Sequence, residues 1–125
     1  MNYNWNEYKI FSEIIENLES DKISEETKIR NSISRMFYHA FHCLLNWVET
    51  KSSYSFKAGT KTHLALIEHL MRTRHIDKAK KYKKLKELRE QCDYEDHVDN
   101  LNQKLFEAKD LHKQLVEPLA KFSQR

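Results

Sequence analysis

Hydrophobic and aromatic residues recur at steps of three and four along most of this chain, which is the period of amphipathic helices. The pattern predicts five helices, at residues 4–20, 24–50, 60–75, 78–94 and from Asp96 onward. Ser24 and Asp96 are expected to cap the second and fifth helices, and Thr60 the third. Residues 51–59 lack the period and contain the only glycine, so a loop is expected there.

The second of these helices differs from the others because it is apolar nearly all round. Its sequence at residues 32–47 is SISRMFYHAFHCLLNW. Between Met36 and Val48, few positions around the helix are polar. A helix of this kind is packed on several sides, by its neighbours in the chain or by a partner chain. We therefore expect it to be the central element of the fold.

Composition favours helices over strands. The 125 residues include one Gly and one Pro, and 33% are charged. The chain therefore has few of the residues that form the tight turns of β-hairpins. The length suits one domain, residues 1–125, with a core of its own. The expected fold is an all-α, four- to five-helix up-and-down bundle with short connections, in which Pro118 kinks or loosens the last helical turn.

Cysteine usage and hydropathy indicate the compartment. Cys43 and Cys92 each lie in an expected helix beside apolar neighbours, which suits reduced thiols better than a disulfide. No basic start is followed by an apolar core, and no run of about 18 apolar residues occurs. We expect a cytoplasmic protein without a membrane partner.

Candidate chemistry lies on the central helix, where Arg35, His39 and His42 occupy positions i, i+4 and i+7 and so share one face. An imidazole can take the proton of a ribose 2′-hydroxyl, and a guanidinium can hold the charge that grows on a phosphate. Such a scheme needs neither metal nor cofactor. The alternative is that these are interior polar residues tied to acids such as Asp93 or Glu68.

Geometry adds a condition to the catalytic interpretation. Seven residues span about 10.5 Å along a helix, so Arg35 and His42 of one chain are poorly placed to hold one phosphate. If two copies of the helix cross near Tyr38 and His39, Arg35 of one copy approaches His42 of the other. We therefore expect a homodimer that forms through the second helix and shares a composite cleft.

A basic stretch follows in the chain. Residues 71–89 contain nine lysines and arginines against two acidic residues, and such a stripe attracts nucleic-acid phosphates without base selectivity. It is equally typical of an ordinary solvated helix face. The candidate RNA-binding residues are Lys80, Lys81, Lys83 and Lys84. The histidines form no recognisable metal-ligand spacing with Cys or carboxylates, so no metal site is expected.

Three segments in order, SRMFYHAFHCLL, KTHLALIEHL and KELREQCDY, resemble the small HEPN domains of bacteria and archaea. The resemblance covers most of the chain from Ile29 onward. It implies a HEPN-like helical bundle, a homodimer with the motif at its interface, and metal-independent RNA cleavage. It also implies a place in a toxin–antitoxin or phage-defence system, with a nucleotidyltransferase-type antitoxin or another defence subunit as partner.

The resemblance also implies roles for individual residues. Arg35 would bind and stabilise the phosphate, His42 would act as general base or acid, and His39 would be an auxiliary. A second group is expected to orient the second helix rather than perform chemistry. This group consists of Lys61, His63, Arg89, Asp93 and Tyr94.

Two other functions stay open at this stage. The first is a non-catalytic HEPN adaptor whose aromatic helix serves purely as an interface, which is favoured by Met36 directly after Arg35. Many active members carry a polar residue at that position. The second is a basic RNA-binding bundle that uses only the lysines of the fourth helix.

Overall fold

The computed structural model describes residues 4–52 and 62–123, and every regular element in these ranges is a helix. The all-α prediction is therefore confirmed for this part of the chain. The helices are α1 (Asn6–Glu16), α2 (Glu25–Ser52), α3 (Thr62–Arg72), α4 (Ile76–Tyr94) and α5 (Leu101–Ser123).

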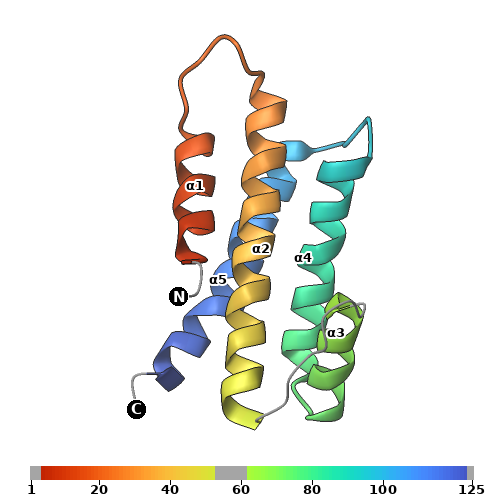
Figure 1. The fold of residues 1–125 in the computed structure, drawn as a ribbon. Coiled ribbons are helices and arrows are strands. Elements are labelled where there is room, and N and C mark those ends of the chain that lie inside the picture. The colour runs from red at the N-terminus through yellow and green to blue at the C-terminus, as the bar shows by residue number, and fades with distance from the viewer. Residues whose placement is uncertain (1–3, 53–61, 124–125) are drawn as a thin grey trace.

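Four of the helices run alternately up and down the bundle, and the short α3 lies beside the first turns of α4 (Figure 1). Helix α2 packs against α1, α4 and α5, so the prediction that it is the central element is confirmed. The apolar residues all around α2 are thus covered largely by neighbours from the same chain.

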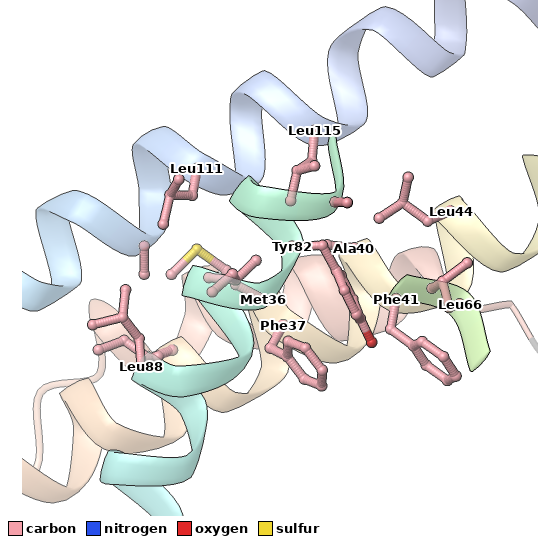
Figure 2. Close-up of a cluster of buried hydrophobic side chains, with 14 of the residues drawn as sticks. Met36, Phe37, Ala40, Phe41, Leu44, Leu66, Tyr82, Leu88, Leu111 and Leu115 are labelled. Carbon is pink, nitrogen blue, oxygen red and sulfur yellow. The ribbon is translucent and has the colours of Figure 1, made fainter. Parts of the chain in front are cut away.

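The hydrophobic core forms where α2, α4 and α5 meet (Figure 2). Phe37, Ala40 and Leu44 of α2 are fully buried, as are Tyr82 of α4 and Leu115 of α5. Tyr82 lies between the Phe37 and Phe41 rings in Figure 2, with ring centroids 5.5 and 6.4 Å away. Because these residues are spaced at helical intervals, the sequence pattern alone predicts this core face.

The helix ends agree only in part with the sequence. Ser24 caps α2 as predicted, since its Oγ accepts a hydrogen bond from the Thr27 amide at 3.1 Å. The predicted Asp96 cap is wrong: α5 begins at Leu101, and Asn100, with φ of 53°, accepts the first helical bond from the Lys104 amide. The expected Thr60 cap and residues 53–59 lie outside the described residues.

Helix α1 is shorter than predicted and is held by polar contacts with α2 and α5. It ends at Glu16, and the C-cap residue Asn17 donates a side-chain N–H to the Glu13 carbonyl at 2.9 Å. Ser12, its only fully covered residue, donates to the Ser32 carbonyl of α2 at 2.9 Å. The small side chains at this contact let the two helices approach closely.

A single arginine joins α2 to the end of α4. Arg30 donates to the carbonyls of Cys92, Glu95 and Asp96 at 3.0, 2.5 and 3.0 Å. These carbonyls belong to the last turn of α4 and the residues that follow it, where no intrahelical donor is available. Arg30 therefore fixes the end of α4, which contains Asp93 and Tyr94, against α2.

Both cysteines are free thiols, as predicted. Pro118 lies inside α5, which continues beyond it to Ser123. In residues 4–52 and 62–123, no helix is both long enough and apolar enough to cross a bilayer.

Candidate functional site: the arginine and histidine face of α2

Arg35, His39 and His42 all contact α1, so they share one face of α2 as the sequence predicts. Arg35 lies against Tyr8, His39 against Asn6, and His42 against Trp5. The face is covered by α1 of the same chain. Helix α2 of a second copy therefore has no direct access to it, and the expected dimer contact through the crossing of two α2 helices stays a prediction that this packing does not favour.

Arg35 is a half-buried guanidinium that no acidic residue neutralises in the described part of the chain. Its central carbon lies 5.2 Å from the Tyr8 ring centroid and 5.5 Å from that of Phe11, so two aromatic rings support the charge. It forms no ion pair or hydrogen bond within the described residues, and its Nε is buried without an acceptor. The alternative of a tie to Asp93 fails for Arg35, because Asp93 contacts Arg89 and Ser34 instead.

His42 is half-buried and stacks on α1. Its ring centroid lies 3.3 Å from that of Trp5, and the two planes differ by 9°. Burial, followed by the charges of His39 and His63, lowers the pKa of His42 from 6.5 to about 4. His42 also lines an open groove of about 470 Å³ with Asn46 and Glu49 of α2. It is therefore a neutral imidazole with access to solvent on one side.

His39 has a different environment, because it is 2% exposed and both ring nitrogens are engaged. Nε2 lies 2.9 Å from the acceptor Asn6 Oδ1, so it carries the proton, and Nδ1 accepts from His112 Nε2 at 2.8 Å. Burial and the charge of Lys9 lower the pKa of His39. These bonds join α1, α2 and α5, and they do not favour the expected auxiliary role of His39 in the chemistry.

Arg89 of α4 is the centre of a second cluster, which lies where α2 and α4 pack against each other. The side chain is 6% exposed, and its guanidinium carbon lies 5.1–5.7 Å from the rings of Phe37, Tyr38 and Tyr94. It donates to the Tyr38 hydroxyl at 3.1 Å and to the Tyr94 hydroxyl at 3.3 Å. Its Nε lies 3.7 Å from Asp93. The network connects α4 with α2, and the orienting role expected of Arg89 and Asp93 stays a prediction.

A row of aromatic side chains joins these two regions, and sequence reasoning did not identify it as part of a site. We call Trp5, Tyr8, Tyr38 and Tyr94 the aromatic row. Trp5 and Tyr8 lie edge to face at 5.0 Å, Tyr8 and Tyr38 at 6.2 Å, and Arg89 bridges Tyr38 to Tyr94. Tyr94 is 74% exposed, unlike a core residue. The only sequence signal was the pair of aromatics three residues apart in the first helix.

The lysines of α4 divide into paired and unpaired residues. Lys81 pairs with Asp77, and Lys84 with Glu107 of α5, each at 2.8 Å. Lys80 and Lys83 are exposed and form no ion pair within the described residues. The stripe is thus weaker as an anion-binding surface than its sequence indicates, because part of its charge is neutralised locally.

Two predicted residues remain, Lys61 and His63. Lys61 falls outside the described residues, and the Nδ1 of His63 lies 2.6 Å from the hydroxyl of Tyr82. His63 therefore contacts the core from α3, and the orienting role expected of it stays a prediction. Within residues 4–52 and 62–123, no three His, Cys, Asp or Glu side chains converge as metal ligands.

The arrangement can hold an anion at Arg35, keep a neutral imidazole at the edge of a groove, and present aromatic rings between them. No family model, no curated protein and no solved structure matches this chain. Its function has therefore to be inferred from the residues and their geometry.

Proposed function

We propose that the chain is a HEPN-type, metal-independent endoribonuclease that acts on single-stranded RNA. The observation that carries the proposal is a guanidinium, Arg35, on the same helix face as a neutral imidazole, His42. Among residues 4–52 and 62–123, no acidic group neutralises this guanidinium. The sequence resemblance supports the same assignment. Single-stranded RNA suits the aromatic row, since unstacked bases pack on aromatic rings.

The reaction follows from the two groups. His42 is uncharged near neutral pH and accepts the proton of a ribose 2′-hydroxyl. The 2′-oxygen then attacks phosphorus, the bond to the 5′-oxygen breaks, and the 5′-oxygen takes a proton from water. The products are a 2′,3′-cyclic phosphate and a 5′-hydroxyl. Arg35 of the partner subunit stabilises the charge that develops on the phosphate oxygens, because Arg35 and His42 of one chain lie about 10.5 Å apart along α2.

In this proposal, the contact between the two copies of the homodimer includes α1 and not α2 alone. Ile10 and Ile14 of α1, and Leu18 two residues after its end, recur at four-residue steps and are 52%, 57% and 38% exposed. A second copy that packs on this stripe would cover the exposed apolar side of the helix whose other side covers Arg35 and His42. We expect Ile14→Glu to dissociate such a dimer in sedimentation experiments at micromolar concentration, whereas a monomeric parent protein contradicts the dimer.

The catalytic proposal is tested by RNA cleavage with substituted proteins. His42→Ala and Arg35→Ala should each lower the rate on unstructured RNA by about a hundredfold or more. The matched controls are His97→Ala and Lys113→Ala, which remove an exposed imidazole and an exposed ammonium elsewhere. Cleavage by both His42→Ala and Arg35→Ala at the parent rate refutes the assignment of these residues.

A second candidate function is a non-catalytic adaptor, and the same exposed stripe on α1 favours it. A partner protein, such as a nucleotidyltransferase-type antitoxin or another defence subunit, would then cover Ile10, Ile14 and Leu18. Expression of the lone chain separates the two candidates. Growth arrest that Arg35→Ala relieves supports the enzyme, and harmless expression supports the adaptor. A role in toxin–antitoxin or phage-defence systems rests on the sequence resemblance.

A further inference from the structure

Helix α1 lies at the edge of the bundle (Figure 1), and most of its apolar side chains face solvent. Ile10, Phe11 and Ile14 are 52%, 45% and 57% exposed, and Ser12 is the only fully buried residue of the helix. In the described part of the chain, the hydrophobic core is formed by α2, α3, α4 and α5, and α1 contributes no residue to it. Because burial of apolar surface is the main force in helix packing, α1 is held more weakly than the helices that share the core.

The contacts between α1 and the helices beside it are largely polar. Three of them join α1 to α2 and α5: Ser12 with Ser32, Asn6 with His39, and Glu16 with Lys109. Hydrogen bonds and exposed ion pairs contribute little net free energy, because water forms similar bonds with the separated groups. Separation of α1 from the bundle is therefore a low-cost opening.

The side of α2 beneath α1 is polar as well. Ser32 and His39 are 0% and 2% exposed, and Arg35 and His42 are half-buried. The Nε of Arg35 is buried without an acceptor in residues 4–52 and 62–123. A buried donor without an acceptor costs free energy, which hydration of the guanidinium would recover. Opening of α1 thus exposes mainly groups that water stabilises.

The same contacts cover both groups that the proposed reaction uses. The rings of Tyr8 and Phe11 lie 5.2 and 5.5 Å from the guanidinium carbon of Arg35. The ring of Trp5 lies flat on His42, with centroids 3.3 Å apart. While these rings are in place, neither a phosphate nor α2 of a second copy reaches this side of the helix. The closed arrangement is therefore incompatible with a composite site.

We propose that α1 is an autoinhibitory cover, which closes the Arg35 and His42 face of α2 in this structure and swings away before RNA binds. The inference rests on the proposed function, because it concerns access to the same two groups. Residues 17–24 connect α1 to α2, so α1 can leave this face while the core between α2, α4 and α5 stays packed. Opening also frees the face for α2 of a second copy, which the composite site requires.

Hydrogen exchange of the full chain tests the opening without RNA. Amides of α1 should exchange at least about a hundredfold faster than those in the central turns of α4, because α1 opens without the core. Protection of α1 equal to that of α4 overturns the proposal.

A disulfide between α1 and α2 holds the cover closed. The Oγ atoms of Ser12 and Ser32 lie 2.8 Å apart, so Ser12→Cys combined with Ser32→Cys brings two sulfurs within bonding reach. Oxidation should slow exchange in α1 and lower RNA cleavage at least about tenfold, and reduction should restore both. Ser12→Cys alone, oxidised in the same way, is the control. Cleavage by the oxidised double variant at the rate of its reduced form overturns the cover.

A second variant loosens the cover without changing the face beneath it. Glu16→Gln removes the ion pair with Lys109 and should raise both RNA cleavage and exchange in α1 about two- to fivefold. Glu13→Gln removes a charge from a neighbouring exposed position of α1 that forms no ion pair with any described residue, and should leave both rates unchanged. Equal rates in Glu16→Gln and Glu13→Gln contradict the proposal.

The cover and the nuclease fail in different ways. If neither the parent nor Glu16→Gln cleaves RNA while oxidation of the double variant still slows exchange in α1, the opening is upheld and the catalytic proposal is refuted. If RNA is cleaved at the same rate with α1 clamped and free, the nuclease is upheld and the cover is refuted.

Discussion

The indole of Trp5 lies flat on the imidazole of His42, with ring centroids 3.3 Å apart and planes 9° from parallel. This contact places the N-terminal end of α1 over a residue that the α2 sequence marks as catalytic. It removes water from one face of the imidazole, and this desolvation is the main reason why the pKa of His42 is lowered to about 4. The residue that precedes α1, Trp5, therefore contributes to the burial that keeps His42 neutral.

Trp5→Ala should raise the pKa of His42 toward its ordinary value, because the largest cause of the lowered pKa is burial. NMR titration of the imidazole measures the change. Phe106→Ala, which removes a 70% exposed ring from α5, is the control and should leave the pKa of His42 unchanged. An unchanged pKa in Trp5→Ala would show that the indole does not desolvate His42.

Stability should fall as the pH is lowered because of His112, which is 7% exposed and bonded to His39. Burial, followed by the charges of His39 and Lys9, lowers the pKa of His112 from 6.5 to about 4. Protons therefore bind the unfolded chain preferentially below pH 6.5. The stability present above pH 6.5 is lost between pH 6.5 and 4, and the loss is on the order of 3 kcal/mol.

Urea unfolding of the parent and of His112→Gln at pH 7 and pH 4.5 tests this linkage. Glutamine keeps an N–H donor for His39 but does not titrate, so the variant should lose less stability on acidification. His97→Gln removes an 82% exposed histidine and should follow the parent. If His112→Gln and the parent lose equal stability, His112 is not the group responsible.

Arg89→Ala should destabilise the fold by about 2–4 kcal/mol, because the buried guanidinium contacts three aromatic rings and donates to two phenols. Thermal or chemical denaturation measures the loss. Arg72→Ala, at an exposed position of α3, should change the free energy of unfolding by no more than about 0.5 kcal/mol. A similarly small effect of Arg89→Ala would contradict the orienting role.

Ser12→Leu should displace α1 from α2, because the Ser12 Oγ lies 2.8 Å from that of Ser32 and leaves no room for a larger side chain. Overpacking of this kind costs about 1–3 kcal/mol. We expect faster proteolysis between α1 and α2 and a rise in the pKa of His42. Glu13→Leu, at the next and exposed position, is the control. Normal protease resistance of Ser12→Leu would show that the contact tolerates bulk.

Sequence periodicity predicted the helices and the central position of α2, because both follow from which residues are apolar at helical steps. It also placed Arg35 and His42 on one face. It failed where an end depends on local geometry: Asn100 adopts a positive φ, and α5 begins at the next residue, Leu101, and not near Asp96. Periodicity contains no information about such single-residue conformations.

What the sequence determined by itself is the all-helical class, the apolar surface of α2 and the presence of an arginine and two histidines on one side of it. Only the tertiary structure decided that α1 covers that side, that Asn6 and His112 engage both nitrogens of His39, and that Arg35 meets no acidic partner among the residues that the structure describes. The reason is physical. Spacing along one helix determines which residues share a face, but the residues that meet that face come from distant parts of the chain, and their packing sets burial, pKa and access.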